Sequence, residues 1–231
     1  MRLFMQAGGA TVELPNTSSA DSVFTVSETV GFRDSVVVDN PVSSVDSLEE
    51  DIWKSIDMDR IDIVAQRKSI ERILERNGEV TLMFYEENGK SEEELIRALM
   101  LSHLTVIYIK QSLGRLSALC GCVVAATGSS CGITWLMGGT YEQVAYAVQN
   151  MIANLTGMIC DGAKPSCALK VTTGVSTAVL SAIMAMENRC VTSVEGIIDE
   201  DVDQSIRNLT KIGSKGMNET DKLVLEIMTS K

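Results

Sequence analysis

Two cysteines, Cys160 and Cys167, are the residues whose type and spacing most directly suggest chemistry in this chain. The loop between them reads Asp161-Gly-Ala-Lys-Pro-Ser166, and its glycine and proline make the chain turn, so both sulfurs can approach one point. Cysteine often packs as a small apolar residue, but the polar loop argues against that role for both thiols. Lys164 and the start of the following helix favour thiolate over thiol. The segment is therefore a candidate metal site.

A second thiol-rich stretch, Leu119-Cys-Gly-Cys-Val123, lies upstream of this loop. Its two cysteines, Cys120 and Cys122, could both face one metal ion, or only one of them could reach it. Four thiolates, from Cys120, Cys122, Cys160 and Cys167, would complete a closed zinc site, whereas three would hold an iron–sulfur cluster. The spacing is compatible with either metal centre.

The composition and charge exclude several classes of protein. The 231 residues carry a formal net charge of −11, and no basic stripe could neutralise phosphates, so nucleic-acid binding is not expected. The N-terminus lacks the apolar stretch of a signal peptide, and we expect a cytoplasmic protein. In that reducing compartment the six cysteines should be free thiols or metal ligands. Residues 116–139 are apolar but interrupted by glycines, so we expect them to be buried and tightly turned, not membrane-spanning.

Other reactive residues have structural interpretations. Cys131 and Cys190 are expected to be structural thiols. The one histidine, His103, lies within a helical pattern and is expected to be packed or half-exposed. The glycine-rich stretch 128–132 lacks the Lys-Ser/Thr ending of a phosphate-binding loop, which disfavours nucleotide binding. The acidic run 199–203 would complement the dipole of a helix that begins there.

Helical periodicity dominates the chain, and the predicted fold class is mostly α. We expect an all-helical C-terminal domain over residues 90–231, a smaller mixed α/β part over 46–89, and a Ser/Val-rich arm or pair of edge strands over 1–45. Ser91 and Glu94 predict a capping box at the start of the helical domain. A strand is expected over 79–85, and the expected helices are 47–56, 60–77, a stripe from 95 to 109, 141–156, 168–188, 200–212 and 219–229.

Three separated motifs follow one another in the helical region. They are Gly114-Arg-Leu-Ser-Ala-Leu-Cys-Gly-Cys122, then Gly157-Met-Ile-Cys-Asp-Gly-Ala-Lys164 with Ser166-Cys-Ala-Leu-Lys170, and last Ile206-Arg-Asn-Leu-Thr-Lys-Ile-Gly-Ser-Lys-Gly-Met217 with Glu219-Thr-Asp221. Together they resemble the C-terminal half of the serine dehydratase α-chain-like family, and within it the L-cysteine desulfidase branch.

This resemblance implies an iron–sulfur-dependent β-eliminating lyase. In the family a [4Fe–4S] cluster is held by three cysteines, and its remaining iron acts as a Lewis acid on a small amino-acid substrate. Loss of sulfide from L-cysteine, or of water from L-serine, leads to pyruvate and ammonia. Matched by motif, the implied cluster ligands are Cys122, Cys160 and Cys167, with Cys120 as the alternative to Cys122.

The resemblance also implies a gap. Family members of this branch are longer, and the half that carries the catalytic base region has no counterpart here. The catalytic residues therefore stay unassigned. Either a partner chain supplies the missing half, or the chain is a metal-binding domain that is catalytically incomplete; a homodimer is the other expected assembly.

Overall fold

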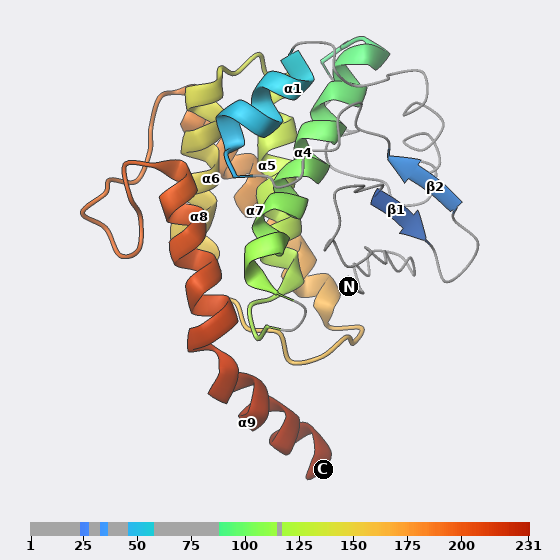
Figure 1. The fold of residues 1–231 in the computed structure, drawn as a ribbon, viewed down its shortest axis with the longest axis vertical. Coiled ribbons are helices and arrows are strands. Elements are labelled where there is room, and N and C mark those ends of the chain that lie inside the picture. Colours follow the sequence, from blue (N-terminus) through green and yellow to red (C-terminus); the bar gives the residue numbers. More distant parts are fainter. Residues whose placement is uncertain (1–23, 28–32, 37–45, 58–87, 115–116) are drawn as a thin grey trace.

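The computed structural model describes residues 24–27, 33–36, 46–57, 88–114 and 117–231 (Figure 1). As predicted, the described chain is mostly α. Strands β1 (Phe24–Ser27) and β2 (Arg33–Val36) pair antiparallel. The predicted helix 60–77 and strand 79–85 lie outside the described residues. The helical elements are η1 (Leu48–Trp53), α1 (Lys54–Asp57), α4 (Glu92–Leu113), α5 (Gly121–Leu136), α6 (Tyr141–Leu155), α7 (Cys167–Met186), α8 (Val202–Lys211), η2 (Ile212–Gly216) and α9 (Asn218–Thr229).

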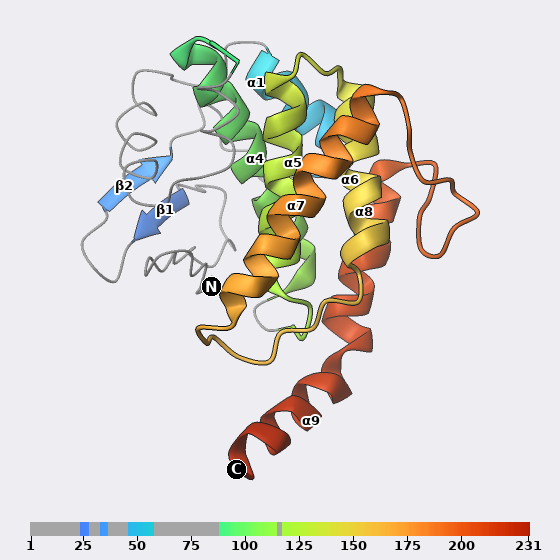
Figure 2. The same cartoon turned by 180° about the vertical axis from the view of Figure 1, so that it is seen from behind.

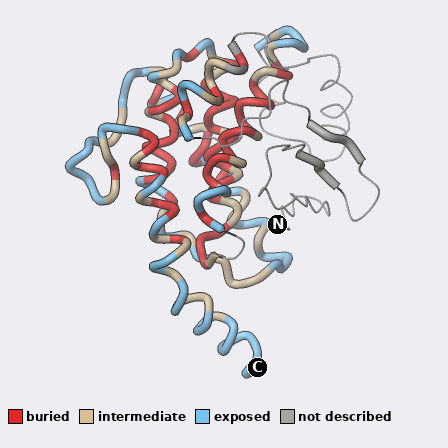
Figure 3. The backbone as a smooth tube through the Cα atoms, in the orientation of Figure 1, coloured by how far each residue is buried: buried red, intermediate tan, exposed pale blue. Residues whose placement is uncertain are grey.

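Helices α4 to α8 form one bundle with a core of aliphatic side chains (Figure 3). Helix α5 is central, because it packs against α4, α6 and α7, and α8 packs against α4 and α6. The predicted capping box is confirmed: Glu94 N–H donates to Ser91 Oγ, and Ser91 N–H donates to Glu94 Oε2 at 2.8 Å. Burial of this apolar core is the main force that holds the helices together.

The prediction that the apolar stretch 116–139 is tightly turned is wrong, because most of this stretch forms the single helix α5. Its glycines serve close packing. A Cβ on Gly128 would meet Ser102 O of α4 at 2.5 Å, and one on Gly132 would meet Ala98 O at 2.9 Å. The interspersed hydroxyls bond back to their own helix, as Thr134 Oγ1 does to Ser130 O at 2.7 Å. Small residues here let α4 and α5 approach closely.

The segment 46–57 packs onto the bundle. Leu48, Ile52 and Ile56 are fully buried, and the Trp53 ring meets the Trp135 ring edge-on, with centroids 5.2 Å apart. Because η1 and α1 contact α4 and their buried side chains join the core cluster, this short segment belongs to the same hydrophobic core as the helical domain.

Asp203 ties this segment to the bundle. Its Oδ1 accepts from Tyr108 Oη at 2.8 Å and from Leu48 N–H at 3.1 Å. Helix α8 does begin in the acidic run, with Asp201 as its N-cap. However, Asp203 is buried and accepts hydrogen bonds from another helix and from residue 48, so it does more than complement the dipole of α8, the role that the sequence suggested. Burial and the Asp203 carboxylate together raise the pKa of Tyr108.

Two helices are only partly covered in the described structure. Helix α7 contacts α5 and α6 on one side, while α9 extends away from the bundle with no buried residue (Figure 2). Among the described residues, α7 alone is long and apolar enough to cross a membrane. Core helices of globular proteins meet the same criterion.

Candidate functional site

An antiparallel bridge joins the two thiol-bearing segments. Leu119 pairs with Ile159, Cys120 N–H donates to Met158 O at 2.9 Å, and Cys160 N–H donates to Ala118 O at 2.6 Å. These backbone bonds hold the segment before α5 beside the segment after α6, although they are far apart in sequence. Cys120 and Cys160 are thereby brought to the same end of the bundle.

The thiols of Cys120 and Cys160 interact directly. Their hydrogen bond is the largest influence on both pKa values: it lowers that of Cys160 and, together with burial, raises that of Cys120. A hydrogen bond from Gly162 and the positive charges of Lys170 and Lys110 lower the pKa of Cys160 further. Cys160 is therefore the thiol that this environment favours as a thiolate, the form that binds metals.

Cys122 and Cys167 begin neighbouring helices. Cys122 lies in the first turn of α5, and its Sγ donates to Lys170 O of α7 at 3.0 Å. Burial raises the pKa of Cys122, and the charge of Cys167 adds to this increase, so the two thiols are within electrostatic range. Cys167 is the first residue of α7, and its Sγ donates to Gly162 O at 3.4 Å.

Two lysines shape the electrostatics of these thiols. Lys170 Nζ donates to Ile159 O at 2.7 Å and also pairs with Asp161, which in turn pairs with Lys164. The Asp161 carboxylate thus anchors the cysteine loop to α7. Lys110, in the last turn of α4, faces Cys160 and Cys120, and burial lowers its pKa.

The third sequence motif is hydrogen-bonded to the first. Ser117 Oγ donates to Gly213 O of η2 at 2.7 Å and accepts from Leu119 N–H at 3.0 Å. A Cβ on Gly213 would overlap Leu113 Cδ1 and would meet Ser117 Oγ at 3.1 Å, so glycine permits this close approach. The first motif therefore contacts both of the others at one end of the bundle.

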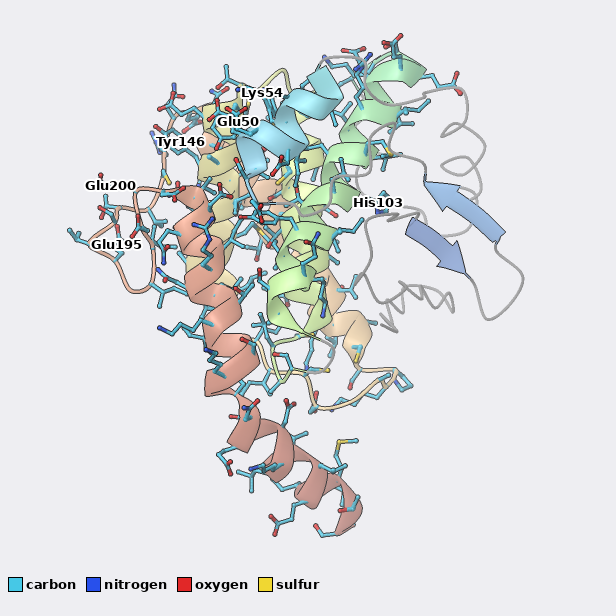
Figure 4. All side chains as sticks on the ribbon, viewed as in Figure 1. Glu50, Lys54, His103, Tyr146, Glu195 and Glu200 are labelled. Atoms are coloured by element: carbon cyan, nitrogen blue, oxygen red, sulfur yellow. The ribbon has the colours of Figure 1, made fainter. Side chains whose placement is uncertain are left out.

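The remaining sequence candidates lie elsewhere. Cys131 is buried within α5, where its Sγ donates to Thr127 O, and Cys190 bonds to Gln149 Oε1 at 3.2 Å. Both fit the structural role predicted for them. His103 lies midway along α4 and is half-buried, as predicted (Figure 4).

Lys110 is not identified from the sequence, and Lys170 and Gly213 are included in motifs without an assigned role. Lys170 stands one turn after Cys167 on a helix, and that spacing was an available signal because such residues share a helix face. Lys110 carried no signal. Its place beside the thiols depends on how α4 packs, which no local pattern encodes.

The donors suit an iron–sulfur cluster in kind, because cysteine thiols lie on adjacent segments under the positive charge of lysines. They are not arranged as a finished ligand set. Within the described residues, no three His, Cys, Asp or Glu side chains converge closely enough to hold a metal ion. To bind one metal centre, Cys122, Cys167 and Cys160 would have to come closer to one another.

The comparisons with known proteins agree with the three motifs. A UPF0597 protein of Bacteroides fragilis is 90% identical over 150 residues, which are 65% of this chain and 35% of that protein. UPF0597 protein YhaM of Escherichia coli is 50% identical over 143 residues, covering 62% of this chain and 33% of that protein. The chain thus covers about a third of the length of these relatives. No solved structure matches it. The family model for the serine dehydratase alpha chain matches residues 79–226. This chain belongs to the serine dehydratase alpha chain family.

Proposed function

We propose that the chain is the thiol-bearing part of an iron–sulfur-dependent lyase that performs β-elimination on L-cysteine or L-serine. Family membership supports a lyase-type role. The observation that carries the proposal is the Leu119–Ile159 bridge, which gathers the cysteines of two motifs at one end of the bundle. A cytoplasmic location would keep these thiols reduced and available to a metal.

The proposed ligands of the [4Fe–4S] cluster are Cys122, Cys160 and Cys167, with Cys120 as the alternative to Cys122. When bound, such a cluster would offer an open iron as a Lewis acid for the leaving group. The chain's own contribution is to favour Cys160 as a thiolate, through the hydrogen bond from Cys120 and then through Gly162, Lys170 and Lys110. Four thiols would also suit zinc, which is the alternative metal.

The reaction would release hydrogen sulfide from L-cysteine, or water from L-serine. The aminoacrylate that remains would take up water and yield pyruvate and ammonia. The step requires a base that removes the proton from the substrate's α-carbon. We assign no residue of this chain to that role.

A second function is favoured by the length of the relatives. Because about two thirds of each relative lies outside the match, the chain could bind the metal but depend on a partner chain for the catalytic base. In that case it is a subunit, and catalysis belongs to the complex.

Pyruvate release tests both functions. The chain is purified without oxygen, supplied with iron and sulfide, and assayed with L-cysteine and L-serine, alone and together with the remaining region of the Bacteroides fragilis relative. Activity only in the mixture would support the subunit role, and activity of the chain alone would exclude it. A mixture that binds iron but releases no pyruvate from either substrate would contradict the lyase proposal.

A further inference from the structure

Helix α7 carries an apolar stripe that no described element covers. Its members are three large apolar side chains and two small hydroxyl-bearing ones between them, all exposed: Leu169, Thr173, Ser176, Leu180 and Ile183. Leu169, Leu180 and Ile183 expose 72%, 51% and 43% of their surfaces. Figure 2 shows α7 in front of α5 and α6, which it contacts with its other side.

The opposite face of α7 is packed as tightly as a core helix. It consists of small residues, and a Cβ on Gly174 would meet Cys122 Sγ at 2.7 Å and Ala126 Cβ at 3.1 Å. Yet only 28% of the helix's most apolar stretch is buried. From Leu169 to Ile183 the stripe runs about 21 Å along the helix. So long an apolar stripe on a charged protein indicates an interaction surface.

The spacing of the stripe indicates what covers it. Successive members lie four, three, four and three residues apart, which is the repeat that packs one helix against another. Thr173 Oγ1 already donates to Leu169 O at 3.1 Å, so its hydroxyl can be covered without a new partner. Both features suit a second helix better than lipid.

We propose that this stripe docks a helix of the polypeptide region that the relatives carry beyond the matched third. About two thirds of the Bacteroides fragilis relative lies outside the match, so that protein holds a large further region covalently tethered to the matched third. The stripe begins two residues after Cys167, so a partner seated on it would lie beside the thiols. This inference deepens the proposed function, because it says where the polypeptide that completes the site would bind.

Hydroxyl-radical footprinting tests the docking without measuring iron or activity, so it can fail independently of the proposed function. Leu180 and Ile183 should be oxidised in this chain alone, but protected at the aligned positions of the intact Bacteroides fragilis relative. Val194, which is 89% exposed on a loop, serves as the control and should be oxidised in both proteins. Equal oxidation of the stripe in the two proteins would overturn the proposal.

A pair of variants tests the same surface by binding. When this chain is co-expressed with the tagged remainder of the relative, Leu180→Asp should reduce the recovered complex at least tenfold, and the matched Val194→Asp should leave it unchanged. Equal recovery of both variants would contradict the proposal. So would a stripe-dependent homodimer of the chain in size-exclusion chromatography, or stripe-dependent binding to phosphatidylglycerol vesicles.

Discussion

Cys160 has surroundings unlike those of the other thiols in the described chain. It accepts hydrogen bonds from Cys120 and Gly162 while Lys170 and Lys110 face it, and all four lower its pKa. No described lysine lowers the pKa of Cys131 or Cys190, and burial raises their pKa values to about 12 and about 11. The same residue type therefore has opposite chemical tendencies at different positions.

This contrast predicts an order of alkylation in the metal-free chain. Iodoacetamide reacts with thiolates, so at pH 6.5 Cys160, whose pKa is about 5, should react at least tenfold faster than Cys190. Reaction at Cys160 should slow as the pH falls below about 5, because the thiol then becomes protonated. Peptide mass spectrometry gives both rates. Equal rates at pH 6.5 would contradict the electrostatic account of this site.

The sequence located the thiols but not their neighbours. Cys160 and Cys167 were recognisable from a turn flanked by cysteines, which is a local pattern. Lys110 lies near Cys160 because the C-terminal end of α4 lies at the same end of the bundle as the Leu119–Ile159 bridge. This arrangement arises from tertiary packing. A single sequence contains no direct record of such contacts.

Helix boundaries were largely predictable, because caps and apolar periodicity are local. The helix predicted at 141–156 corresponds to α6, and that predicted at 168–188 corresponds to α7. The glycines of α5 were misinterpreted, since a glycine that permits a turn and one that permits close helix contact look identical in sequence. Only the position of the neighbouring helix distinguishes them.

The approach of α7 to α5 predicts a sensitive glycine. Gly174→Ala should destabilise the protein by about 1–3 kcal/mol, because the added methyl group would overlap Cys122 Sγ. The matched change Gly216→Ala meets only Ile212 Cγ2, at 3.9 Å, and should cost much less. Urea unfolding measures both. If Gly174→Ala is as stable as Gly216→Ala, the two helices are not packed as closely as described.

At the scale of the whole molecule, the fold unit extends beyond the matched region. Residues 46–57 precede the family match at 79–226, yet they bury apolar side chains in the same core. The division into parts at 46–89 and 90–231 stays a prediction, and the contacts of residues 46–57 with the helical bundle cross it. Asp203 is one of the polar links, because it accepts from both Tyr108 and Leu48.

Removal of this link should weaken the whole unit. Asp203→Ala removes the acceptor of the Leu48 N–H and one of the two acceptors of Tyr108 Oη, which also donates to Asp46 O at 3.2 Å, and should lower the free energy of unfolding by about 1–3 kcal/mol. Glu200→Ala, at an exposed position on the neighbouring loop, should change it by less than about 0.5 kcal/mol. Chemical denaturation with tryptophan fluorescence is suited to the comparison, since Trp53 lies in the attached segment. Similar midpoints for the two variants would mean that residues 46–57 contribute little to stability.

The central claim is that the gathered thiols hold an iron–sulfur cluster. Iron and acid-labile sulfide should be counted in the anaerobically reconstituted chain, in Cys160→Ala and in the matched control Cys190→Ala. We predict about four irons per chain, with absorbance near 400 nm, for the unaltered chain and for Cys190→Ala. Cys160→Ala should lose most of both signals. An iron-free, colourless chain, or a Cys160→Ala variant that retains its full iron content, would contradict the account.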